Sequence, residues 1–178
     1  DKDSSKRLSA VRALTKSSEG SEVAIKALAE HCLVEQDPEV IFELSMFFSV
    51  NRPGLDSTVP IFMRALEHDR AEVRRVAAVA LSQLGEKAPL EVIPHLVELL
   101  KAENSMVRVE GIISLMRVSS RAPDSAIQAL AARCLVEKDP LVLDFMFSSL
   151  GGLNDRLTLV VPTLKRALED EDGRVRMG

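Results

Sequence analysis

Aromatic residues are scarce in this chain of 178 residues, which has no Trp, no Tyr and only six Phe. Hydrophobic residues nevertheless make up 46 % of it, so an interior must be built from aliphatic side chains and Met. Gly and Pro occur only eight times each, which argues against long loops and extended sheets. No apolar run approaches the roughly 18 residues of a membrane-spanning helix, so we expect no membrane insertion.

Basic residues are also in short supply. Lys and Arg number 23 against 27 Asp and Glu, which gives a net charge of −4. Nucleic-acid-binding domains usually carry a basic excess, because phosphate contacts supply much of their affinity. The composition therefore argues against a nucleic-acid partner. We also expect the protein to be cytoplasmic.

The chain does contain an internal repeat. Five positions lie 34 residues apart: Lys26, Pro60, Pro94, Gln128 and Pro162. The text of residues 59–75, VPIFMRALEHDRAEVRR, returns in residues 161–176 as VPTLKRALEDEDGRVR, and CLVEQDPEV returns 102 residues later as CLVEKDPLV. Self-similarity at this period indicates a repeat array in which each unit buries its apolar face against its neighbours.

Each repeat is predicted to be a helical hairpin. Residues 89–102 carry apolar side chains at helical spacing, residues 103–105 interrupt the pattern, and residues 106–120 resume it. We name the two helices A and B. Asp37–Pro38 and Asp139–Pro140 place a capping carboxylate before a proline at the first position of a B helix.

The predicted fold is all-α, an α-solenoid with a right-handed superhelix and about five hairpins. Residues 1–178 form a single repeat domain in this interpretation, with units at about 1–20 (partial), 21–55, 56–88, 89–122, 123–155 and 156–178 (partial). Because both outer units are incomplete, we expect the chain to be a fragment of a longer array. The two cysteines, Cys32 and Cys134, fall at equivalent points of separate units, which predicts buried structural thiols.

Two motifs of the unit identify a family resemblance. An A-helix proline is followed by leucines, as in VIPHLVELL, and the turn into the B helix reads D-x-x-V-R or close to it at residues 69–74, 103–108 and 170–176. The chain therefore resembles HEAT-repeat proteins, in the short HEAT-like form also seen in phycobilisome lyases. Tetratricopeptide repeats need a Trp/Tyr framework, and ankyrin repeats need T-P-L-H; both features are missing.

The resemblance implies a ladder in which the Arg after the valine pairs with turn carboxylates along the array. Arg74, Arg108 and Arg176 match that position, whereas Ile41 and Leu143 replace it in units one and four. We therefore expect an interrupted ladder.

No catalytic arrangement is visible in the sequence. His31, His68 and His95 are isolated from one another, and no Cys or Ser lies at a spacing that would form a catalytic pair or a metal site. We expect a protein that is not an enzyme, with no cofactor, no metal and no small-molecule substrate.

The resemblance implies that the B helices line a concave face, and two features of them suggest a binding site. Arg75 and Arg108 could belong to a basic strip, or to the structural ladder and ordinary solvated surface. Aromatic residues concentrate on the B helices of units one and four, so five apolar residues could form stations on that face or could turn into the core: Ile41, Phe42, Met46, Leu143 and Phe147.

The leading interpretation is a non-catalytic scaffold that binds a protein partner on the concave B-helix face. Two alternatives remain open at this point. One is a chaperone-like subunit of the phycobilisome-lyase type, which rests on the resemblance alone. The other is a nucleic-acid-binding HEAT protein, for which a steep salt dependence of binding would be diagnostic.

Overall fold

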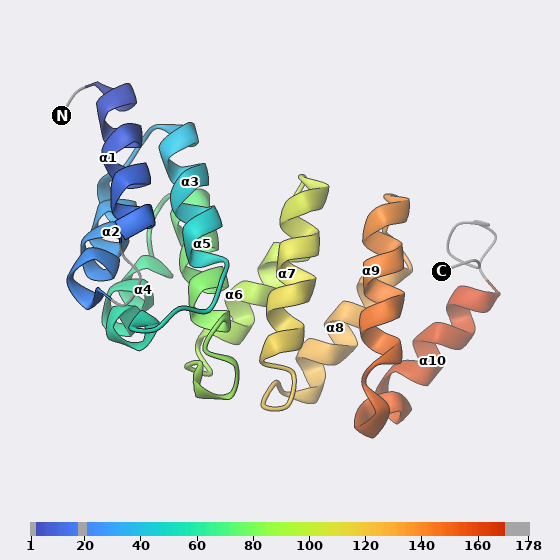
Figure 1. Cartoon of the computed structure of the whole chain (residues 1–178). Helices are drawn as coiled ribbons and strands as arrows, with labels where there is room; N and C mark the ends of the chain where they lie inside the picture. Colours follow the sequence, from blue (N-terminus) through green and yellow to red (C-terminus); the bar gives the residue numbers. More distant parts are fainter. Residues whose placement is uncertain (1–2, 18–20, 170–178) are drawn as a thin grey trace. The chain divides into compact units, whose positions relative to one another are not determined.

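The computed structural model describes residues 3–17 and 21–169 (Figure 1). Within these residues the chain forms ten α-helices and three short 3-10 helices, and no strand. The all-α prediction is confirmed. The helices in order are α1 (Ser4–Ser17), α2 (Glu22–Val34), α3 (Pro38–Phe48), η1 (Leu55–Thr58), α4 (Val59–Ala65), α5 (Ala71–Ser82), η2 (Gly85–Lys87), α6 (Val92–Leu99), α7 (Ser105–Arg117), α8 (Asp124–Cys134), α9 (Pro140–Gly151), η3 (Asn154–Arg156) and α10 (Leu157–Leu168).

The chain divides into an N-terminal part, residues 1–92, and a C-terminal part, residues 93–178. In the N-terminal part the B helices α1, α3 and α5 pack in sequence, and the A helix α2 packs against the A helix α4. In the C-terminal part α7 packs against α9 and α8 against α10. Within each part, B helix therefore packs on B helix and A helix on A helix, which is the packing of neighbouring hairpins in an α-solenoid.

Capping residues set where the B helices begin. Asp37 accepts hydrogen bonds from the backbone N–H groups of Glu39 and Val40 at 3.0 and 3.3 Å. Asn104 and Asp139 cap α7 and α9 in the same way. These side chains satisfy N–H groups that have no partner inside the helix, so the Asp–Pro steps define the starts as the sequence predicted.

The core is aliphatic, with one aromatic cluster in the N-terminal part. The rings of Phe47 and Phe48 meet edge to face at 4.9 Å, and those of Phe48 and Phe62 at 4.8 Å. Cys32 and Cys134 are free and buried, as predicted. Burial raises the pKa of each thiol to about 12, so neither is poised to react as a thiolate.

Helices α6 and α7 approach each other closely at Gly111. A Cβ atom at this position would lie 2.7 Å from the Cβ atom of Leu99, nearer than side chains tolerate. Gly111 therefore permits the short distance between the two helices of this hairpin.

Candidate protein-binding surface and the buried turn carboxylates

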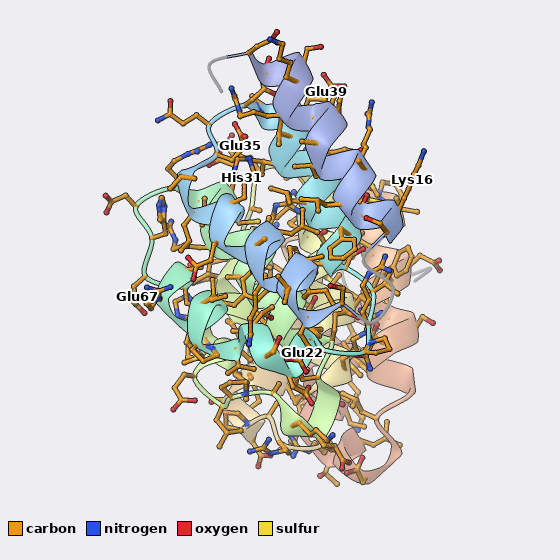
Figure 2. The ribbon with its side chains drawn as sticks, turned by 60° about the vertical axis from the view of Figure 1, so that its left-hand side comes forward. Lys16, Glu22, His31, Glu35, Glu39 and Glu67 are labelled. Carbon is orange, nitrogen blue, oxygen red and sulfur yellow. The ribbon has the colours of Figure 1, made fainter. Side chains whose placement is uncertain are left out.

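A buried carboxylate organises the turn between α2 and α3. Arg7 of α1 donates through Nε and Nη2 to the two carboxylate oxygens of Glu35, at 2.9 and 3.0 Å. The N–H groups of Gln36 and Asp37 donate to the same carboxylate at 2.8 Å each, and His31 Nε2 lies 2.8 Å from it. Figure 2 shows His31 and Glu35 together at the C-terminal end of α2.

These contacts decide the charge of Glu35. Its side chain is only 1 % exposed. The hydrogen bond from Arg7 is the largest influence; burial opposes it, and the turn N–H groups support it, so the pKa falls to about 2. Glu35 is therefore an anion that holds α1 onto the turn of the following hairpin.

The C-terminal part repeats the device 102 residues later. Arg108 of α7 donates through Nε and Nη2 to the carboxylate of Glu137 at 2.8 and 2.9 Å. Arg133 lies 3.1 Å from the same carboxylate, and the N–H groups of Lys138 and Asp139 donate to it at 2.8 and 3.0 Å. Burial would raise the pKa of Glu137, but the turn N–H groups and the two guanidinium groups outweigh it and hold that pKa below its ordinary value.

Arg108 is therefore a structural residue, and its assignment to a basic binding strip is wrong. It is buried, and Nη1 also donates to the carbonyl oxygens of Ala102 and Glu103 at 2.8 Å each. The planar guanidinium of Arg108 donates to one carboxylate and two carbonyl groups at the same time, and these partners keep it inside the turn rather than in solvent.

The ladder itself differs from the expected one. Arg74 donates to the carbonyl oxygens of His68 and Asp69, at 2.7 Å each, in its own turn. Arg7, which the sequence did not single out, occupies the ladder position of α1. The recurrence of Glu35 and Glu137 in the two CLVE segments was the available signal, since each of them pairs with an arginine of the preceding B helix. Arg176 lies outside the described residues.

Helix α3 exposes two large apolar side chains of the N-terminal part on one face. Phe42 and Met46 are 61 % and 55 % exposed and lie one turn apart on the helix. We call these two residues the α3 patch. Arg12 of α1 lies beside it, 3.1 Å from Glu43, and Arg75 of α5 donates to Ser45 Oγ at 3.1 Å. Phe42 and Met46 thus lie between Arg12 of α1 and Arg75 of α5.

Two of the predicted apolar stations are not on the surface. Ile41 and Leu143 are 4 % and 2 % exposed, so their assignment to the binding face is wrong. Ile41 and Leu143 both stand where the ladder arginine is expected. In these turns the carboxylates of Glu35 and Glu137 already pair with Arg7 and Arg108 of the preceding B helices. The apolar side chains at the ladder position are therefore free to pack inward. Phe147 is half-buried and supports such a face only in part.

A second apolar pair, which the sequence did not single out, lies on α9. Leu141 and Phe145 are 49 % and 36 % exposed and lie four residues apart. The aligned positions of α3 are Glu39 and Glu43. The two Phe-bearing B helices therefore carry their exposed apolar side chains at different aligned positions, which alignment through Val40 and Val142 could have revealed.

Two of the three histidines, His31 and His68, make structural contacts. His31 pairs with Glu35, and His68 Nε2 lies 3.1 Å from the carbonyl oxygen of Leu33. Among residues 3–17 and 21–169, no three or more His, Cys, Asp or Glu gather closely enough to hold a metal ion. No helix within the same ranges is both long and apolar enough to cross a membrane.

Comparison with known proteins identifies the repeats. The family model for HEAT repeats matches residues 59–144. Two crystal structures of engineered proteins from the Northeast Structural Genomics Consortium each superpose on 99 % of the chain with a TM-score of 0.54, at 23 % and 24 % identity. The match covers 88 % of the first engineered chain and 53 % of the second. No curated protein sequence matches the chain. At this identity the structural likeness concerns the fold alone.

Proposed function

Because the chain is a HEAT-like repeat protein, we propose that it is a non-catalytic scaffold that binds a protein partner through the α3 patch. HEAT repeats generally mediate protein interactions, and in the N-terminal part the B helices α1, α3 and α5 pack in a row. We infer that the row α1–α3–α5 supplies the contact surface in the N-terminal part.

The exposure of Phe42 and Met46 carries this proposal. A Phe side chain contributes 150–250 Å² of contact area when it becomes buried, about the size of an interface anchor. Met adapts its shape to different partners because its side chain is flexible and polarisable. These two side chains lie on adjacent turns with more than half of each exposed, so they form a contiguous apolar patch of the kind that marks protein-binding sites.

The surroundings of the patch indicate the chemistry of the partner. Arg12 and Arg75 flank it on the neighbouring helices, and Glu43, which follows Phe42 on α3, pairs with Arg12. Binding anchors are typically apolar at the centre with charged residues at the rim. We therefore expect a partner that presents an apolar side chain between polar or charged groups.

The experiment compares a double variant, Phe42→Ser with Met46→Ser, against the unchanged chain and against Val136→Ser. Val136 is 62 % exposed and lies in the turn between α8 and α9, so it controls for the loss of an exposed apolar side chain. Quantitative affinity capture from the native extract, with melting temperatures measured in parallel, provides the readout.

We expect the double variant to melt within a few degrees of the unchanged chain and to lose a partner that the Val136→Ser control retains. A ΔΔG below about 1 kcal/mol is typical for exposed positions. Either a large drop in melting temperature for the double variant or retention of every captured protein by it would contradict the proposal.

The other interpretations have less support. The nucleic-acid alternative drew on a basic strip, and Arg108 is buried in an ion pair rather than available to phosphates. A lyase-like role has only the resemblance behind it.

A further inference from the structure

A cavity of about 400 Å³ lies between two successive interhelical connections of the N-terminal part. One connection leads from α3 to α4, and the other follows α5. The cavity is lined by Asn51, Arg52, Pro53, Gly54 and Asp56 from the first connection and by Leu84 and Lys87 from the second. Cavities of this size hold small-molecule ligands in other proteins.

The C-terminal part shows how an arginine bridges an equivalent pair of connections. Arg156, which precedes α10, donates through Nη1 to the carbonyl oxygen of Ala122, which precedes α8, at 2.5 Å. The same Nη1 atom lies 3.8 Å from Oδ1 of Asp124. The arginine side chain thus spans the two connections and brings a cation to a carboxylate.

The internal repeat identifies the matching residues around the cavity. A shift of 68 residues, which is two periods, places Asp56 at the position of Asp124 and Ala88 at that of Arg156. Ala88 is buried and too short to span the connections. Within residues 3–17 and 21–169 the carboxylate of Asp56 has no ion-pair or hydrogen-bond partner. The cavity therefore lies where the C-terminal part has an arginine, and it contains the carboxylate that such an arginine would pair with.

Arg52 is fixed in the wall of the cavity by two contacts with Phe47. Its Nε donates to the carbonyl oxygen of Phe47 at 3.0 Å, and its guanidinium carbon lies 4.2 Å from the centre of the ring. No described residue accepts a hydrogen bond from Nη1 or Nη2 of this guanidinium. A guanidinium held in this way can donate two parallel hydrogen bonds from its terminal nitrogens to a carboxylate.

Lys87 brings a second cation to the cavity. Its side chain is exposed and, in the part of the chain that the structure describes, forms no ion pair. Two cations and one carboxylate therefore line the same cavity without pairing with one another. Groups of opposite charge that are held apart in this way can bind opposite ends of one small ligand, and Pro53 and Leu84 add an apolar wall.

We propose that this cavity binds a small zwitterion that carries both a carboxylate and an ammonium group, as an amino acid does. Arg52 and Lys87 donate hydrogen bonds to the ligand carboxylate. Asp56 accepts hydrogen bonds from the ligand ammonium group, which serves this carboxylate as Arg156 serves Asp124. Because cations outnumber carboxylates in the lining, a ligand with a carboxylate is favoured over one with an ammonium group alone.

The test measures the binding of four small molecules to the full chain. L-Leucine and 6-aminohexanoate are zwitterions that differ in the spacing of their charges, whereas hexanoate and hexylamine carry one charge each. Two-dimensional NMR of the isotope-labelled chain reports on the cavity through the amide signals of residues 51–56 and 84–88. Titration calorimetry gives the affinities.

We expect saturable binding of at least one zwitterion with a Kd of about 1 mM or tighter. Hexanoate and hexylamine should each bind at least about tenfold more weakly, because each leaves a charged group of the cavity without its hydrogen bonds. The zwitterion that binds more tightly reports the spacing between the cations and Asp56.

Two variants and two controls connect binding to the charged residues. Asp56→Asn and Lys87→Met change exposed side chains, so both should fold, and each should weaken zwitterion binding at least about tenfold. Asp144→Asn and Lys165→Met are the matched controls, since both residues are exposed and lie outside the cavity lining. Melting temperatures, measured in parallel, verify that all four variants are folded.

Four results would overturn the proposal. They are no saturable shift at residues 51–56 and 84–88 with either zwitterion, equal affinity for a zwitterion and a single-charge compound, unchanged affinity in Asp56→Asn or Lys87→Met, or an equal loss of affinity in the controls. None of the substituted residues belongs to the α3 patch, so the outcome is independent of the proposed scaffold function.

Discussion

The buried carboxylate of Glu35 should make the stability of the protein depend on pH in the acid range. Its pKa is about 2 in the folded chain, against 4.5 for an ordinary Glu. A folded-state pKa below the unfolded value means that the folded chain favours the charged form. The contribution to stability is therefore complete above about pH 5 and is lost as the pH falls toward 2.

The size of the effect follows from the difference between the two pKa values. A pKa difference of one unit corresponds to 1.36 kcal/mol, so the fall in pKa from 4.5 to about 2 gives about 3 kcal/mol for Glu35. Solvent screens little of it, because the side chain is only 1 % exposed. Other carboxylates titrate in the same range, and the assay must therefore isolate this one.

Urea unfolding, followed by far-UV circular dichroism at several pH values, compares the unchanged chain with Glu35→Gln. The difference in unfolding free energy should be about 3 kcal/mol at pH 7 and should fall below about 1 kcal/mol near pH 2. Glu30→Gln is the control, since Glu30 and its partner Arg64 are 54 % and 66 % exposed, and such pairs contribute about 0–1 kcal/mol. A Glu35→Gln deficit that does not change with pH would refute the reasoning.

Two further predictions concern the C-terminal part. Arg108→Met should cost about 3 kcal/mol in urea unfolding, because it leaves the Glu137 carboxylate buried with fewer partners; a loss below about 1 kcal/mol would show that the pair is not structural. Gly111→Ala should lower the melting temperature despite the better helix propensity of Ala, because its Cβ atom would lie 2.7 Å from that of Leu99. Gly151→Ala is the matched control, since nothing lies within 4 Å of a Cβ atom there, and equal melting temperatures for the two variants would contradict the close approach.

The sequence by itself determined the repeat and its hairpins. A period of 34 residues and the Asp–Pro steps at residues 37–38 and 139–140 predicted the B-helix starts, because capping and periodicity are local properties of the chain. The burial of Cys32 and Cys134 followed from their equivalent places in two units.

Only the tertiary structure decided which side chains face solvent on the Phe-bearing helices. The sequence left open whether Ile41 and Phe42 face solvent or the core, and the structure shows Ile41 buried and Phe42 exposed. Neighbouring residues on a helix point about 100° apart, and the packing of the adjacent helices selects which of them is covered.

The ion pairs were predicted only in part: the resemblance implied that Arg108 pairs with a turn carboxylate, but it identified neither Glu137 as the partner nor the Arg7–Glu35 pair. Arg7 and Glu35 are separated by 28 residues, and Arg108 and Glu137 by 29. A local sequence pattern does not reveal which residues meet over such a span, because each ion pair forms only when one B helix packs against the turn of the next hairpin. The physical reason is that helix boundaries depend on neighbours in the chain, whereas burial and pairing depend on neighbours in space.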